Sequence, residues 1–439
     1  MIRPKYRCLV LALCGLSQIS LAHTTLLDVY RQAQQSDPIY LQAQQDMLSD
    51  KQALPIAIAP NLPQVGFTGV AQRSWANQTG IPTVLSNTQS YTIQATQPLI
   101  NLANWEGVRE ASAGAKAAVA TFEAAKQNLI VRVAGAYFKV LFAQDTLRFV
   151  RAKKLALRRQ LDQARQRYKV GLDAITNVYQ AKSKYDAAVA EEIGDQLSLT
   201  NTLEELRQLT GHYYSDLAKL NGELPLVKPS PNNIKDWVDL ATKNNFSLQA
   251  QRFATLAKKA EVSVQWAGHM PTLDLNGQYQ RNRVLDRSIT ANAPSEANAR
   301  SLNLTVTLPL FSGGAVHAAT KKAAYDYASS QQALEGAYRN TVVTTRSNFN
   351  SIISGISLIK ADRQSIFSTQ ASLKSTEAAY RVGTKTIIEV LNTQTDLFDA
   401  QQKHAQDQYQ FISDVLALKE AAGSLNEKDL IQINNLLQK

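Results

Sequence analysis

The side chains that could bind a metal or act as nucleophiles are few and widely scattered in this sequence. Zinc sites need several histidine or cysteine ligands at short spacing, whereas the five histidines stand far apart, at His23, His212, His269, His317 and His404. Both cysteines, Cys8 and Cys14, lie close to the N-terminus. We therefore expect no metal site, and we interpret the histidines as ordinary polar residues.

Motifs for phosphate binding and for nucleophilic catalysis are also missing from the sequence. Gly313 and Gly314 come between a strand-like and a helix-like stretch, which superficially resembles a phosphate-binding loop. The sequence has neither G-x-x-x-x-G-K-S/T nor G-x-G-x-x-G, and none of its serines sits in G-x-S-x-G. We interpret the glycine pair as a strand-to-helix turn. We predict no catalytic residue and no cofactor, so the chain is not expected to be an enzyme.

The N-terminus is typical of a secretory signal. Basic residues at positions 3, 5 and 7 precede an apolar run from Cys8 to Leu16, and Ser20-Leu21-Ala22 fits a small-x-small cleavage site. The alternative is a membrane anchor, but this apolar run is too short to span a bilayer. We predict a signal peptide over residues 1–22, which leaves a mature chain without cysteine and therefore without disulfides.

The chain is basic, with 47 Lys and Arg residues, 36 Asp and Glu residues and a net charge of +11. The basic residues are spread out, and an exported chain does not meet cytoplasmic nucleic acid. We therefore predict no nucleic-acid partner and interpret the charge as solvated helix faces and contact with anionic lipid. No segment after residue 22 is apolar enough for a transmembrane helix, so a membrane span would have to consist of β-strands.

The sequence contains two copies of one unit. Tyr168-Lys169-Val170-Gly171 matches Tyr380-Arg381-Val382-Gly383, and Thr96-Gln97-Pro98-Leu99 matches Thr307-Leu308-Pro309-Leu310. Further matches keep the same order along the chain, which indicates a duplication. We predict a first structural repeat over residues 23–227 and a second over residues 228–439.

Each copy contains a long stretch that suits a helical hairpin. Proline is absent from Leu99 to Leu224 and from Leu310 to Lys439, and apolar residues recur there at coiled-coil spacing. A glycine interrupts each stretch where a helix would end. We predict helical hairpins at about 102–211, with its tip at Gly171, and at about 314–423, with its tip at Gly383.

Before each hairpin lie two segments in which apolar and polar residues alternate. They predict strands at about 63–75 and 88–99 in the first copy and at about 271–285 and 300–311 in the second, joined by polar loops at 76–87 and 286–298. Four strands cannot close a membrane barrel, so several chains must share one. The pattern leaves two or three chains open. It also leaves open whether four aromatic residues form a membrane-interface belt or pack internally: Trp75, Tyr91, Trp105 and Phe311.

Four segments carry a resemblance that covers the whole mature chain. They are Arg167-Tyr168-Lys169-Val170-Gly171-Leu172-Asp173-Ala174-Ile175-Thr176, Thr210-Gly211-His212-Tyr213-Tyr214, Gly268-His269-Met270-Pro271-Thr272-Leu273-Asp274-Leu275 and Gly423-Ser424-Leu425-Asn426-Glu427. The chain resembles the TolC family of outer-membrane efflux and secretion ducts. The resemblance implies an α+β membrane protein of three protomers, with a shared twelve-stranded transmembrane β-barrel that continues into a long periplasmic α-helical coiled-coil tunnel. Helices at about Leu26–Leu54, Ile234–Gln265 and Glu427–Leu437 would form a belt around its middle.

The resemblance also implies a function. A homotrimer in the outer membrane of a Gram-negative bacterium, in contact with outer-membrane lipid and with a large periplasmic part, would serve multidrug efflux and type I protein secretion. It would receive cargo from an inner-membrane efflux pump or ABC transporter. A periplasmic adaptor (membrane fusion) protein would dock on the hairpin tips, at Val170, Gly171, Leu172, Val382, Gly383 and Thr384. The alternative function, a periplasmic coiled-coil adaptor or scaffold protein, explains the hairpins but leaves the four strands unexplained.

The periplasmic gate of the family corresponds to residues near the two tips. Its carboxylate ring falls at Glu389 and Asn392, and its closing network falls at Thr176, Asn177, Tyr380 and Lys385. Family members often carry aspartate where this chain has Asn177 and Asn392. Lys385 then lacks a carboxylate at position 177, although Asp173 is one helical turn away. We therefore expect weaker cation binding and a less tightly latched closed state. By spacing alone, these would be ordinary solvated helix residues.

Overall fold

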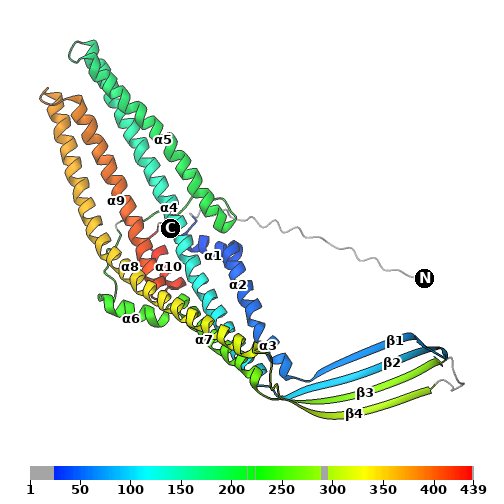
Figure 1. Ribbon diagram of the computed structural model, residues 1–439. Coiled ribbons are helices and arrows are strands. Elements are labelled where there is room, and N and C mark those ends of the chain that lie inside the picture. Colours follow the sequence, from blue (N-terminus) through cyan, green and yellow to red (C-terminus); the bar gives the residue numbers. More distant parts are fainter. Residues whose placement is uncertain (1–23, 215, 223, 288–294, 438–439) are drawn as a thin grey trace, which may run out of the picture.

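The computed structural model shows an elongated molecule with a β-sheet at one end and two helical hairpin tips at the other (Figure 1). The structure describes residues 24–214, 216–222, 224–287 and 295–437. The predicted signal peptide, residues 1–22, lies outside the described residues, as does most of the predicted loop at 286–298. Among the described residues, no helix is both long and apolar enough to cross a membrane.

The sheet joins the two halves of the chain. It has four antiparallel strands in the order β1-β2-β3-β4, with the bounds β1 (Gln64–Gln78), β2 (Ile81–Ile100), β3 (Thr272–Arg287) and β4 (Ser295–Thr307). β2 of the first half pairs with β3 of the second half, for example at Ile93 and Tyr279. β1 and β4 are consequently the two edges of the sheet, and each has one side without a strand partner in the single chain.

The strands differ from the segments predicted by alternation. The expected polar loop at 76–87 is wrong, because β1 and β2 continue to a tight turn where Gln78 pairs with Ile81 and Gly80 has φ +82°. Ser74 pairs with Ser86 in this extension, since the ladder is made by backbone groups and does not need apolar side chains. β4 starts and ends earlier than the predicted 300–311, and Pro309, which has no N–H to donate, follows soon after its end.

Each half then contributes one very long helix and a shorter return helix: α4 (Leu102–Lys169) with α5 (Ile175–Thr210), and α8 (Ala315–Arg381) with α9 (Ile387–Ala421). At about 1.5 Å per residue, α4 and α8 are each roughly 100 Å long. α4 begins at the N-cap Asn101, whose side chain accepts a hydrogen bond from the backbone of Asn104. α4 and α8 run from the sheet to the tips, and α5 and α9 return from the tips to the middle of the molecule (Figure 1).

The shorter helices lie against these hairpins and differ in part from the predicted belt. They are α1 (Leu26–Ser36), α2 (Pro38–Lys51), α3 (Ala53–Ile58), η1 (Ala59–Asn61), α6 (Ile234–Asn244), α7 (Phe246–Trp266), η2 (Ala267–His269) and α10 (Glu427–Asn434). α2 and α3 pack along α4, and α7 packs on both α4 and α8 toward the sheet. Each of the predicted segments 26–54 and 234–265 is therefore divided into separate helices. Of the shorter helices, α1, α6 and α10 lie around the middle of the molecule.

The breaks in these segments have local causes. Asp37 ends α1 and caps α2, where its side chain accepts a hydrogen bond from Tyr40, and Pro38 stands at the first position of α2. Asn245 separates α6 from α7 in the same way and caps α7 through Leu248. Asp37 is 1% exposed and forms a two-pronged ion pair with Arg132 of α4, at 3.2 and 2.6 Å. This pair ties the α1–α2 corner to the long helix.

Buried side chains form two separate clusters along the helices. The larger cluster lies at mid-length, where α4, α8 and α9 meet α1 and α10, and includes Tyr137, Phe138 and Tyr409. The Tyr137 hydroxyl donates to the carbonyl of Ala218 at 2.6 Å. The smaller cluster lies near the tips and includes Leu157, Tyr380 and Ile387. The tips are therefore held by a packed core of their own.

Candidate functional site: the hairpin tips

The first hairpin reverses direction over five residues between α4 and α5. Gly171 has φ +75°, a conformation in which a side chain is strained. Its N–H donates to the carbonyl of Tyr168 at 3.0 Å, and the N–H of Leu172 donates to the carbonyl of Arg167 at 2.9 Å. Ala174 stands at the N-cap of α5 and offers no side-chain cap.

The second hairpin repeats this turn but has a stronger helix start. Gly383 has φ +81°, and its N–H donates to the carbonyl of Tyr380 at 3.1 Å. Thr386 caps α9 in a capping box with Glu389, whose carboxylate accepts from the Thr386 N–H at 2.8 Å and from its hydroxyl at 3.0 Å. Thr386 therefore corresponds in structure to Ala174, and Thr176 is the second residue of α5.

A polar cluster joins the two hairpins at the tips. The Tyr380 hydroxyl at the end of α8 donates to the Asp173 carboxylate at 2.9 Å. Arg167 of α4 donates to the same Asp173 oxygen at 2.8 Å, and its guanidinium lies 5.1 Å from the Tyr380 ring centre. Tyr380 is 4% exposed; burial raises its pKa to about 12, and the Asp173 carboxylate adds to this. The hydroxyl therefore stays protonated and keeps its bond to Asp173 at neutral pH.

Lys385 takes a different partner from the one considered in the sequence. It forms an ion pair with Glu389, four residues later, rather than with Asp173. The hydrogen bonds from Lys385 and from Thr386 lower the pKa of Glu389 to about 2. Glu389 therefore stays ionised throughout the physiological range, with a lysine beside it and a capping role in α9.

The remaining predicted gate residues are less engaged within one chain. Thr176 and Asn392 are exposed and Asn177 is half-buried. In the part of the chain that the structure describes, Asn177 forms a backbone hydrogen bond to Ala174 at 3.0 Å but no side-chain hydrogen bond. The residues brought together are thus Arg167, Asp173 and Tyr380, and separately Lys385 and Glu389.

The sequence analysis assigned Tyr380 and Lys385 to the closing network, which stays a prediction, and it did not include Arg167. Arg167 and Asp173 are opposite charges on either side of the Gly171 turn, and this is the signal that could have paired them. Their contact depends on how the turn folds back, which spacing alone does not reveal. The contact to Tyr380 spans 207 positions of sequence.

The predicted docking residues form the outermost surface of both turns. Val170 is 68% exposed, Leu172 is 66% exposed and Val382 is 77% exposed. Apolar side chains are uncommon at such fully solvated tips unless a partner covers them. Gly171, Gly383 and Thr384 lie beside them, and the Thr384 hydroxyl donates to the carbonyl of Ala379 at 3.0 Å.

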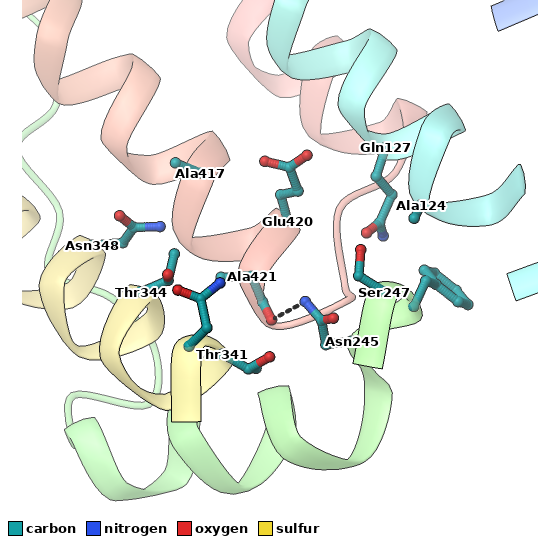
Figure 2. Close-up of a pocket in the computed structure, with 12 residues that line it drawn as sticks. Ala124, Gln127, Asn245, Ser247, Thr341, Thr344, Asn348, Ala417, Glu420 and Ala421 are labelled. Carbon is teal, nitrogen blue, oxygen red and sulfur yellow. Dashed lines mark hydrogen bonds between the residues drawn. The ribbon is translucent and has the colours of Figure 1, made fainter. Parts of the chain in front are cut away.

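Outside the tips, a small polar hollow of about 190 Å³ lies where α4, α7, α8 and α9 meet (Figure 2). Asn245 donates from its side-chain amide to the carbonyl of Ala421 at 3.0 Å, closing one wall. Burial raises the pKa of Glu420 at this hollow, while a hydrogen bond from Asn128 opposes the rise. A single carboxylate surrounded by amide and hydroxyl groups is typical of a packing contact between helices and not of a catalytic centre.

The other residues considered for chemistry are dispersed in the structure. Within the described ranges, no group of three or more His, Cys, Asp or Glu residues could hold a metal ion. Gly313 and Gly314 have φ of +62° and +82° and form the turn into α8, as predicted.

Comparisons with known proteins agree with this architecture. A family profile described as "Outer membrane efflux protein" matches residues 29–212 and 237–424. Outer membrane protein TolC of Escherichia coli (strain K12) is 36% identical, with 98% of this chain and 88% of that protein covered. Proteases secretion protein PrtF of Dickeya chrysanthemi is 26% identical, with 93% of this chain and 90% of that protein covered. The crystal structure of the outer membrane protein VceC from Vibrio cholerae has a TM-score of 0.79 at 20% identity, with 91% of this chain and 96% of that chain covered.

The four-stranded sheet, the long hairpins and these matches define a channel protein of the outer membrane with a periplasmic helical part. The chain belongs to the outer membrane efflux protein family. The predicted resemblance to the TolC family is thereby confirmed, and the alternative of a periplasmic adaptor or scaffold is not favoured.

Proposed function

We propose that three copies of this chain form a continuous exit duct, and the observation that carries the proposal is the sheet with two free edges. β1 and β4 are 15 and 13 residues long, and among the residues that the structure describes neither has a strand partner on its outer side. Unpaired backbone groups are not tolerated in lipid, and four strands are too few to close on themselves. Three copies joined edge to edge give a closed barrel of twelve strands.

The two faces of the sheet fit such a barrel. On one face β4 exposes Leu302, Leu304 and Val306. On the other face the neighbouring positions are Asn303 and Thr305. The first face suits lipid and the second suits a water-filled lumen, as in membrane barrels. Strands of 13 residues or more are long enough to cross a bilayer when tilted.

The helical hairpins continue the duct into the periplasm. Three copies of α4 and α8 run the length of a tunnel roughly 100 Å long. Three copies of α5 and α9 bring its wall to twelve helices in the half nearer the tips. The duct is a passive conduit, and the energy for transport comes from an inner-membrane partner, either an efflux pump or an ABC transporter.

The gate of this duct lies at the tips, where the tunnel meets its partners. Glu389 and Asn392 are three residues apart on α9 and therefore share a face of that helix. In a trimer they give one ring of three carboxylates, each beside its own Lys385. The contact between Tyr380 and Asp173 holds the two hairpins of each chain together and favours the closed state.

The cargo includes small molecules and secreted proteins. The family description refers to efflux, while the names of PrtF and of Alkaline protease secretion protein AprF of Pseudomonas aeruginosa refer to protease secretion. A periplasmic adaptor docks on the exposed apolar tips at Val170, Leu172 and Val382. Because this surface recognises the adaptor and not the cargo, one duct serves both efflux pumps and ABC transporters.

Deletion of the gene, followed by complementation, tests this function. Loss of the chain should raise drug sensitivity and stop export of proteins secreted through ABC transporters. A Val170→Asp/Val382→Asp variant should fail to restore either activity although it still forms conducting trimers in bilayers. Val227→Asp, at a residue 68% exposed in a loop away from the tips, should restore both. Recovery of the protein as a soluble periplasmic monomer would contradict the proposal.

A further inference from the structure

The apolar face of the sheet carries a row of arginines. Positions on this face include Val65, Phe67, Ile93, Leu273 and Leu302, all partly or fully exposed. Further along the same strands, and at the same alternate positions, the side chains change to arginine. The four are Arg73 on β1, Arg281 and Arg283 on β3, and Arg300 on β4.

The strand register places the arginines close together across the sheet. Arg300 pairs with Tyr279, two positions before Arg281. Arg283 pairs with Gln89, and Gln89 pairs with Ala71, two positions before Arg73. All four arginines are exposed. They therefore form a band across the strands rather than isolated charges.

Little negative charge offsets this band. Among the described side chains of this face, the acidic residue is Glu296, which pairs with Arg281 at 2.5 Å. The register also places Asp286 on this face, because Asn87 pairs with both Arg73 and Asp286, so four arginines and two acidic residues leave a net charge of +2 for each chain. Arg73 lies over the Trp75 ring at 5.3 Å and Arg300 over the Tyr279 ring at 5.6 Å. Stacking on an aromatic ring orients a guanidinium and leaves its N–H groups free to bind an anion.

Arg73 and Arg283 lie in the halves of β1 and β3 that are remote from the helices, and Arg281 and Arg300 lie near the middle of β3 and β4. From Leu273 to Arg281 the chain advances eight residues, about 27 Å along the strand and roughly 20 Å of membrane depth at a tilt near 40°. A lipid-facing charge is strongly destabilising at the bilayer midplane but costs little at the border. The arginines therefore fit the headgroup level of the outer leaflet.

We propose that the band of Arg73, Arg281, Arg283 and Arg300 binds the phosphate groups of the anionic glycolipid in the outer leaflet. Arginine presents paired N–H donors that match phosphate oxygens, and a band with net positive charge complements a phosphorylated headgroup. The inference rests on the proposed function, because it requires the apolar face of the sheet to be the lipid-facing wall of the shared barrel.

Binding of phosphorylated and dephosphorylated lipid A to purified trimers, measured by native mass spectrometry, tests the proposal. Several arginines near a charged surface add their attractions for phosphate, so the wild type should bind the phosphorylated form at least about tenfold more tightly. Arg73→Gln/Arg283→Gln/Arg300→Gln, which keeps the Arg281–Glu296 pair, should lose this preference. The matched control, Arg158→Gln/Arg159→Gln/Arg346→Gln, removes three exposed arginines of α4 and α8 and should keep it.

The proposal is overturned if the wild type shows no preference or if the sheet variant retains it. Excess inorganic phosphate should not displace the glycolipid, and displacement would show a site for free anions instead. Single-channel conductance is recorded on the same preparations. Conducting trimers without a lipid preference would refute this inference alone, whereas the absence of conducting trimers would refute the proposed duct.

Discussion

At the scale of single residues, the tips use their charges in pairs. Glu389 caps α9 and also pairs with Lys385, while Asp173 accepts hydrogen bonds from both Tyr380 and Arg167. Asp173 therefore joins Tyr380 to Arg167, and Lys385 takes Glu389 as its partner in place of a carboxylate at position 177. We therefore expect the closed state of the gate to be weakened less than the presence of Asn177 alone suggests. The weak cation ring remains a prediction, because Asn392 adds no charge and Lys385 offsets Glu389.

Lys385→Gln should strengthen block of the channel by divalent cations. Removal of the adjacent positive charge strengthens the attraction between Glu389 and a bound cation, so block should need severalfold less cation. The pKa of Glu389 is lowered to about 2 in the wild type and should rise toward its ordinary value in the variant. Because the block requires ionised Glu389, it should then fade at a higher pH as the solution is acidified. Single-channel recording in planar bilayers measures both effects.

Glu389→Ala is the companion variant for this measurement. It should abolish the divalent block in the wild-type background and also in the Lys385→Gln background. Thr386 can still cap α9 through its own hydroxyl, which accepts from the Glu389 backbone, so the helix start survives. A block that persists unchanged without the glutamate would show that the ring has been assigned to the wrong residue.

Tyr380→Phe should loosen the closed state of the gate. The variant removes one buried hydrogen bond to a charged group, worth about 1.5–3 kcal/mol, while the ring keeps its packing against Leu157 and Ile387 in the tip cluster. The open fraction, measured as mean conductance, should therefore rise by about tenfold or more until it saturates. Tyr168→Phe, at a tyrosine 46% exposed, is the control and should leave conductance unchanged. Equal conductance of Tyr380→Phe and Tyr168→Phe would show that the hydrogen bond between Tyr380 and Asp173 does not hold the gate closed.

At the scale of elements, two glycines in equivalent places of the repeat have unequal surroundings. Gly211 ends α5 with φ +71° and Gly423 follows α9 with φ +66°. A Cβ at Gly211 would meet nothing within 4 Å, whereas a Cβ at Gly423 would lie 2.2 Å from the carbonyl oxygen of Asn244. The backbone between α6 and α7 thus rests directly on Gly423. This contact joins the middle helices of the second half to the end of α9.

Gly423→Ala should therefore destabilise the protein much more than Gly211→Ala. Both changes place a side chain in the left-handed region, at a cost of about 1–2 kcal/mol, but only Gly423→Ala also forces the Asn244 backbone away. The midpoint of thermal unfolding in detergent should fall clearly further for Gly423→Ala. Similar midpoints for the two variants would show that the close contact adds nothing to stability.

The sequence predicted the helical hairpins more accurately than the strands. The absence of proline and the coiled-coil spacing predicted both hairpins to within a few residues, since these are local properties of α4, α5, α8 and α9. The strands extend further than alternation indicates, because a ladder between Ser74 and Ser86 needs only backbone groups. The contact of Asp173 with Tyr380 was not predictable, because it joins distant segments through the shape of two turns.

In the whole molecule, the proposed duct requires three chains to share one barrel. β1 and β4 are separated by two strands within a chain, so their mean lines lie about 14 Å apart. A disulfide needs Cα atoms within about 7 Å and cannot link these two strands inside one sheet. A disulfide between β1 and β4 therefore reports contact between neighbouring chains. The mature chain has no cysteine of its own, since Cys8 and Cys14 belong to the predicted signal peptide.

The most direct measurement is oxidative crosslinking between a cysteine on β1 and a cysteine on β4. Thr68→Cys supplies the first cysteine. The second lies on the same face of the sheet and is placed in turn at Ala299, Ser301 or Asn303. One of these registers should convert the protein into covalent trimers on a denaturing gel, because each chain links to two neighbours and three links close the ring. Either cysteine alone should leave monomers. Covalent dimers as the end product, or no crosslink at any register in conducting preparations, would contradict the shared twelve-stranded barrel.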